Sequence, residues 1–425
     1  MLKTLVSYVV AMALALLIIA PPLDYTIPLM VNSFHWCYLT IVCGLLGMYI
    51  LSFNLHWALK CLAVYLFIGC FLSQIPYVSF NAYLLVVATY YLYLLLQHID
   101  HKVLLKFLCA AFWLEAILTV FQLFGHDRLL NFDRQEPVFF GTVMQYMRFS
   151  SVLALMTPFL LLRNKFYLIP IVVLCILSQS MTFMMSLSAL ILTYTMLKYR
   201  GYRDILINTS ICLLSAVVVY VLYDLDSVRG AILPENGGRL VSWWVALKTW
   251  VMDTSLAKPP LPLHGPFRLD WFLFGHGLDT FLPLFPVYKH DYNPFPQVHN
   301  DWLQFPWEIG LIGLILIITY AVNLSIRLYK QSRYDLLSGL ACIATNMFFA
   351  FPTRMTQTMW LIVAYVAYCE SQIGVSYAHT ESDPGLIAGR LLGGGARGKS
   401  QAQTKVRPAT TGSPIDDPFR EQCNC

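Results

Sequence analysis

The sequence is dominated by apolar runs separated by short polar connections. A run of roughly 17–25 apolar residues is long enough for a helix to cross the hydrocarbon core of a bilayer. Backbone groups in lipid must be hydrogen-bonded within their own segment, so runs of this kind predict helices. The pattern predicts an all-α polytopic membrane protein with about twelve transmembrane helices, at residues 3–20, 36–54, 57–73, 77–97, 103–124, 143–163, 166–178, 181–198, 204–223, 307–326, 335–351 and 356–373.

Two segments depart from this pattern. Residues 224–306 form a long polar and proline-rich insertion that separates nine predicted helices in 1–223 from three in 307–373. A connection of this length is typical of a functional loop or a disordered one, and its five tryptophans favour packing. Residues 374–425 are rich in Gly, Ser, Thr and Pro and are expected to form a flexible tail.

Within the long loop, the stretch "GGRLVSWWVALKTWVMD" has helical periodicity. Leu240, Trp244 and Leu247 fall on one face, and polar residues such as Ser242 and Thr249 fall on the other. The segment predicts a short helix lying at the membrane interface, with its tryptophans at headgroup depth.

Composition agrees with membrane insertion, because 58% of the residues are hydrophobic and only 12% are charged. Soluble domains contain about 25% charged residues, so a soluble protein is excluded. The first apolar run resembles a signal peptide, but Pro21, Pro22 and the later runs favour an uncleaved first helix. The cysteines lie mostly inside apolar runs, which predicts buried thiols and no disulfide framework.

The distribution of Lys and Arg predicts the orientation. Cytoplasmic connections carry an excess of these residues. With both termini in the cytoplasm, the cytoplasmic ends contain Lys3, Lys60, Lys102, Lys106, Arg163, Lys165, Lys198, Arg200, Arg203, Arg327, Lys330 and Arg333. The loop at 224–306 is then on the outer side of the membrane.

Several arginines, Arg148 and Arg239 among them, lie on the outer side and so run against this bias. A guanidinium group binds pairs of phosphate oxygens and keeps its charge, which suits the diphosphate of a lipid-linked substrate. The structural alternative for these arginines is snorkelling to the membrane surface or a salt bridge with Glu136, Asp224 or Asp226.

His299 opens a polar stretch, "HNDWLQFPWE", immediately before an apolar run. We expect a short polar helix that begins at His299 and in which Asn300, Gln304 and Glu308 recur every four residues, with Pro306 at the junction with the next span. A neutral imidazole can remove a proton from an attacking hydroxyl. A purely structural histidine is the first alternative. The second is a zinc site formed by His264, His276, His290 and His299, whose long and irregular spacings are not typical of one.

These residues resemble the O-antigen ligase superfamily, which includes WaaL lipopolysaccharide ligases, Wzy-type polymerases, and PglL-type and pilin protein O-oligosaccharyltransferases. The resemblance covers residues 237–313, in the segments "GGRLVSWWVALKTW", "FLFGHGLDTF" and "HNDWLQFPWEIGLIG". The family pattern matches Gly238, Arg239, Leu240 and Trp243; Gly275, Gly277 and Phe281; and His299, Asn300, Leu303, Glu308, Gly310 and Gly313.

The resemblance implies a transferase in the inner membrane of a bacterium that uses neither metal nor cofactor. It is expected to take a glycan from undecaprenyl diphosphate on the periplasmic side, where the loop at 224–306 would lie. His299 is then the base for the acceptor hydroxyl, and Arg239 binds the diphosphate. Arg148, or alternatively Arg134, is the second phosphate ligand. The supporting residues are Asn300, Gln304, Glu308, Trp243 and Gln145.

The acceptor is left open between the lipid A core and a protein Ser or Thr, such as one on a pilin. Gly141 and Gln145 resemble the Gly-x-x-x-Gln of the protein-glycosylating branch. A Wzy-type polymerase is the alternative within the family. A transporter or flippase for a lipid-linked substrate is the alternative of another class, and it predicts mid-membrane charges, of which Glu115 is the clear example. The expected partners also include membrane lipids but not nucleic acid.

Overall fold

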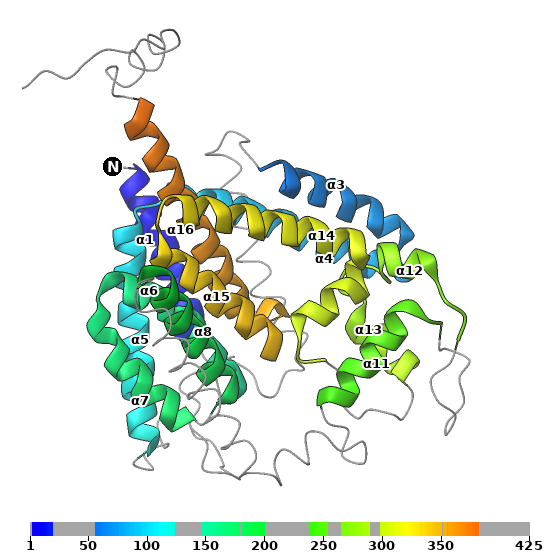
Figure 1. The fold of residues 1–425 in the computed structure, drawn as a ribbon, viewed down its shortest axis with the longest axis horizontal. Helices are drawn as coiled ribbons and strands as arrows, with labels where there is room; N and C mark the ends of the chain where they lie inside the picture. Colours follow the sequence, from blue (N-terminus) through cyan, green and yellow to red (C-terminus); the bar gives the residue numbers. More distant parts are fainter. Residues whose placement is uncertain are drawn as a thin grey trace, which may run out of the picture. The chain divides into compact units, whose positions relative to one another are not determined.

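The computed structural model describes residues 2–19, 56–123, 146–178, 180–199, 239–253, 265–289, 298–350, 352–354 and 356–381. Within these ranges the chain is helical, and its β-structure is limited to one isolated bridge, between Met252 and Phe267. The α-helices, in Figure 1, are α1 (Leu2–Ile19), α3 (Trp57–Leu72), α4 (Pro76–His98), α5 (His101–Leu123), α6 (Tyr146–Arg163), α7 (Leu168–Ser178), α8 (Met181–Lys198), α11 (Arg239–Val251), α12 (Leu269–Phe274), α13 (Phe281–Lys289), α14 (Asp301–Lys330), α15 (Tyr334–Phe349) and α16 (Thr356–Glu381).

The chain divides into two units, Met1–Val375 and Ser376–Cys425. In the second unit the description ends with the last turn of α16, so most of the predicted tail lies outside the described residues. The first unit contains the other helices and everything described below.

All but two of the predicted spans coincide with helices of the structure. The exceptions, 36–54 and 204–223, lie outside the described residues. Among the described residues, four helices are long and apolar enough to cross a membrane: Pro76–His98, His101–Gln122, Met181–Lys198 and Asp301–Lys330. Large apolar side chains also point outward from the helices, for example Val64, Phe71 and Leu84, each at least 60% exposed. Such surfaces are costly in water, and they match a lipid environment.

The main apolar core lies between helices from both halves of the chain. α8 packs against α15 and α6, and α5 packs against α1 and α6. Phe159 of α6 and Tyr365 of α16 meet edge to face, with 5.1 Å between their ring centroids. Helices from the C-terminal part of the chain therefore pack against N-terminal helices in the same core.

Charged groups are also buried among these helices. Glu115 of α5 is fully buried. Glu370, within the predicted span 356–373, accepts two hydrogen bonds from the guanidinium of Arg327 and one, at 3.1 Å, from the hydroxyl of Tyr320. Glu115 is thus not the only carboxylate in the predicted spans, and Glu370 is neutralised by a cation on α14.

Candidate functional site

The three segments of the family-like pattern come together around one aromatic cluster. Its buried members come from α11, α12, α13, the N-terminal part of α14 and the segment just before α14, and they are Val245, Ala246, Trp271, Phe281, Phe285, Val298 and Trp307. We call this set the loop core. Figure 1 shows α11, α12 and α13 grouped at one end of α14. Residues separated by more than 50 positions in the sequence thus form one folded site.

The helix α11 confirms the periodicity predicted for this segment. Trp244 and Leu247 are exposed, each at 45%, whereas Ser242 and Thr249 on the opposite face are buried. The buried face that packs on the protein is mixed, since Val245 and Ala246 are buried beside Ser242 and Thr249, and the exposed face carries Trp244 and Leu247.

Trp243 connects α11 to the segment that carries His299. Its indole N–H donates a hydrogen bond of 3.0 Å to the carbonyl oxygen of Val298, the residue before His299. Val298 is fully buried in the loop core. Trp243 therefore fixes the backbone from which the imidazole projects.

His299 has a left-handed backbone conformation, with φ of 54°. A residue with a β-carbon adopts this conformation only at a cost in free energy. Residues of this kind are concentrated at functional sites. The imidazole is partly exposed, while Asn300 beside it is 1% exposed. Asn300 caps α14, accepting the N–H of Leu303 at 3.3 Å. The helix begins at Asp301, so the prediction that it begins at His299 is wrong: His299 occupies the tight turn before the cap.

The polar residues spaced four apart are buried together. Gln304 is 4% exposed and Glu308 is 1% exposed. The side-chain amide of Gln304 donates to Oε1 of Glu308 at 3.0 Å, and the backbone N–H of Asp279 donates to Oε2 at 3.0 Å. Asp279 itself has a positive φ of 60°. Glu308 thus joins α14 to the turn that precedes α13, and its buried oxygens have donors, as burial requires.

The helix α14 is interrupted at Gly310, with φ of 64° and ψ of −177°. The prediction that Pro306 marks the junction is wrong, because the helix continues through Pro306 and breaks four residues later. Around the break the carbonyl oxygens of Trp307 and Glu308 accept the N–H groups of His276 and Gly277, each at 2.9 Å. The break therefore provides acceptors for a turn from another part of the chain.

Glycine is required where these backbones meet. A β-carbon on Gly275 would lie 2.3 Å from the carbonyl oxygen of Glu308, and one on Gly310 would lie 2.2 Å from that of Leu273. A β-carbon on Gly277 would lie 2.0 Å from Oγ of Ser73, in the turn between α3 and α4. The glycines of the family-like pattern thus serve close packing between α12, α14 and this turn.

His276 lies inside the loop core and was considered in the sequence only as a zinc ligand. It is fully buried, its ring stacks on Trp307 with 3.9 Å between centroids, and its Nε2 lies 3.0 Å from the carbonyl oxygen of Thr249. Burial lowers the pKa of His276 to about 3, so the ring is neutral. Its contacts give it a structural role. His264 and His290, the other members of the zinc alternative, lie outside the described residues.

The predicted phosphate ligands Arg239 and Arg148 each lie at the start of a helix. Arg239 is the first residue of α11, one turn before Trp243, and so belongs to an element of the loop core. Arg148 lies in the first turn of α6, which packs against α5, α8 and α15. Gln145 and the alternative ligand Arg134 lie outside the described residues.

A second arginine of the loop segment, Arg268, is already paired. Its guanidinium donates to both carboxylate oxygens of Asp270, at 3.0 and 2.7 Å, and lies 4.5 Å from the ring centroid of Trp271. The hydrogen bonds from Arg268 hold the pKa of Asp270 below its usual value. This ion pair offers less positive charge to a phosphate than an unpaired arginine would.

The connection between α15 and α16 also contacts the site, although no motif in the sequence pointed to it. The carboxylate of Asp301, in the first turn of α14, accepts the N–H of Thr353 at 3.0 Å. Arg354 follows in the same short 3-10 helix, Pro352–Arg354. It lies in a short connection on the predicted outer side, so the charge bias that singled out Arg148 and Arg239 could have identified this segment.

The site therefore combines a partly exposed histidine in a constrained turn with a buried, hydrogen-bonded carboxylate–amide pair, Gln304 and Glu308, five and nine residues further along the chain. Such an arrangement can hold an imidazole in a fixed direction while a hydroxyl approaches it.

No protein-family model matches the sequence, and no curated protein matches it. The interpretation therefore depends on the residues of the site and on the pattern that they form.

Proposed function

We propose that the chain is a membrane glycosyltransferase of the O-antigen ligase type, which transfers a glycan from undecaprenyl diphosphate to an acceptor hydroxyl. The observation that carries the proposal is the turn at His299. Its backbone is held on one side by Trp243 and on the other by the Asn300 cap, and its φ is positive. A chain that needed only a helix start here would not require a histidine in this conformation.

The proposed topology has twelve spans with both termini in the cytoplasm. It places 224–306 in the periplasm, where the lipid-linked donor would be used. Support comes from the four long apolar helices, the outward-facing apolar side chains, and the concentration of Lys and Arg at one set of helix ends.

In the proposed reaction, the acceptor oxygen forms a bond with the anomeric carbon of the glycan. The neutral imidazole of His299 takes the proton from that oxygen as it attacks. The bond between the anomeric carbon and the diphosphate oxygen breaks, and its electron pair leaves with the diphosphate. Arg239 and Arg148 bind this anion, because guanidinium groups match the geometry of phosphate oxygens.

The other residues of the proposed site hold its backbone in place. Asn300 ends the turn that carries His299, and Gln304 and Glu308 hold α14 against the turn at Asp279. In this scheme Glu308 is a positioning residue, since both of its oxygens already accept hydrogen bonds from the protein. The acceptor hydroxyl belongs either to the lipid A core or to a protein.

A deletion strain tests this proposal in the cell. We expect loss of the chain to remove glycan from the lipid A core or from a glycoprotein, as seen in lipopolysaccharide ladders and in pilin mass. The wild-type chain should restore the modification, whereas His299→Ala should insert in the membrane but fail to restore it. Full restoration by His299→Ala would contradict the proposed role of the histidine. Shortened polysaccharide chains on an otherwise modified core would indicate a polymerase.

A further inference from the structure

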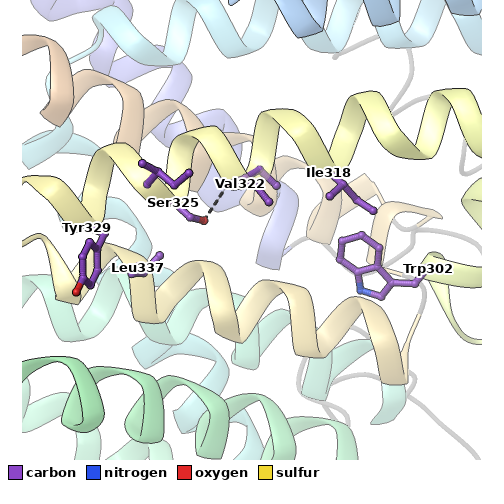
Figure 2. A pocket seen from close by; sticks show the side chains of 8 residues that line it. Trp302, Ile318, Val322, Ser325, Tyr329 and Leu337 are labelled. Carbon is purple, nitrogen blue, oxygen red and sulfur yellow. Dashed lines mark hydrogen bonds between the residues drawn. The ribbon is translucent and has the colours of Figure 1, made fainter.

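A narrow apolar groove runs between α14 and α15, with a volume of about 430 Å³. Figure 2 shows its lining side chains, most of which come from a single stripe of α14, with Leu337 on the side of α15. The residues of α14 that line the groove include Trp302, Ile318, Ala321, Val322, Ser325 and Tyr329.

The shape of the groove follows from the sequence of α14. Ile318, Val322, Ser325 and Tyr329 recur every three or four residues and so lie on one side of the helix. Ala321 and Ser325 are small and one turn apart, which leaves a trough between the larger side chains. At about 1.5 Å per residue, the distance along the helix from Ile318 to Tyr329 is roughly 16 Å. The groove is thus long enough for an extended chain.

The lining accepts hydrocarbon and little else. The side-chain hydroxyl of Ser325 donates to the carbonyl oxygen of Ala321 at 2.8 Å, so this donor is used within the helix. None of the lining residues carries a charge. Ile318 and Val322 are 41% and 50% exposed, so the groove is open to the surroundings of the helix along its length.

One end of the groove lies next to the proposed catalytic turn. Trp302 lines this end, and its indole N–H donates to the carbonyl oxygen of Ala344 on α15 at 3.0 Å. Trp302 follows His299 by three positions in the sequence. The groove then runs away from the turn along α14, so a ligand whose polar group lies at His299 could place an apolar chain in it.

We propose that this groove holds the first part of the polyprenyl chain of the diphosphate-linked substrate. The inference depends on the proposed function, which supplies a donor with a diphosphate at one end and a long hydrocarbon at the other. Continuity between the groove and the turn favours this occupant over a bilayer acyl chain or a second copy of the protein, since neither would need to begin at His299.

The free energy of binding the polyprenyl chain in the groove comes from complementary shape. Lipid tails are as apolar as the groove, so burial from water provides no driving force between the two. The branched methyl groups of a polyprenyl chain can instead pack into the trough over Ala321 and Ser325, where they gain van der Waals contacts. Filling the trough should therefore weaken binding of the long-chain donor specifically.

The test uses the full-length protein in lipid nanodiscs and the same glycan diphosphate on two carriers, undecaprenyl and a two-isoprene prenyl chain. Ala321→Trp and Val322→Trp fill the groove. We expect them to raise KM for the undecaprenyl donor roughly tenfold, toward that of the short donor, with kcat nearly unchanged. Val64→Trp, which alters an exposed valine of α3, is the matched control and should change neither value. Equal KM changes for both donors, or none, would overturn the proposal.

A second measurement separates this inference from the proposed function. An undecaprenyl diphosphate that carries a diazirine in its first isoprene units is photo-crosslinked to the wild-type protein, and the labelled peptides are identified by mass spectrometry. Labelling concentrated on residues 318–329 would support the groove even if the protein transferred no glycan. Labelling spread evenly over the exposed helices would overturn it, whatever the transfer activity.

Discussion

The neutral state of His276 predicts a pH dependence of stability. The ring is fully buried against Trp307, and burial lowers its pKa from 6.5 to about 3. Below pH 6.5 the unfolded chain binds a proton that the folded chain does not, so stability falls as the pH decreases toward 3. The loss attributable to this group is about 2 kcal/mol at pH 5 and on the order of 5 kcal/mol at pH 3.

The matched variant is His276→Gln, which keeps an N–H donor for the Thr249 carbonyl but does not titrate. Unfolding of the purified proteins in detergent, followed by tryptophan fluorescence from pH 8 to pH 5, compares the two. We expect the variant to be less stable at pH 8, because the stacked ring is lost, but to have a flatter pH dependence. Above pH 7 the two curves should run parallel. Parallel curves down to pH 5 would refute the assignment of a neutral, buried ring.

The other predictions concern the backbone contacts and the charges. Gly310→Ala brings a β-carbon to 2.2 Å from the Leu273 carbonyl oxygen at a positive φ, so we expect a loss of at least about 2 kcal/mol in the same unfolding assay; Gly69→Ala, in open space, is the control, and equal effects would contradict the packing. Glu308→Gln replaces one acceptor by a donor and should cost about 1–3 kcal/mol, with wild-type stability as the contrary result. Arg239→Lys keeps the charge but loses the guanidinium fork, and should raise KM for the diphosphate donor in a transfer assay; an unchanged KM would count against diphosphate binding there.

The helices could be predicted from the sequence because apolar length and periodicity are local properties. The runs at 57–73 and 181–198 coincide with α3 and α8 to within a few residues. The helix beginning at Arg239 follows from its alternating faces, whereas its buried side does not, because Val245 and Ala246 are buried together with Ser242 and Thr249. Local patterns suffice when one element satisfies its own hydrogen bonds.

The details of the site could not be predicted, because they depend on contacts between distant segments. The break at Gly310 rather than at Pro306 is supported by N–H groups of His276 and Gly277 that approach from another segment. Proline is the stronger local signal for a helix break, whereas close backbone approach is a tertiary property. The burial of His276 depends in the same way on Trp307.

The central claim is that His299 removes the proton from an acceptor hydroxyl during glycan transfer. The most direct measurement uses purified full-length protein, an undecaprenyl diphosphate-linked glycan and a lipid A core or pilin acceptor, and follows both the glycosylated acceptor and released undecaprenyl diphosphate. We expect the wild type to form both products in the presence of a chelator. We expect His299→Ala to form neither, although its unfolding transition should remain close to that of the wild type. Transfer by a folded His299→Ala protein at the wild-type rate would contradict the account.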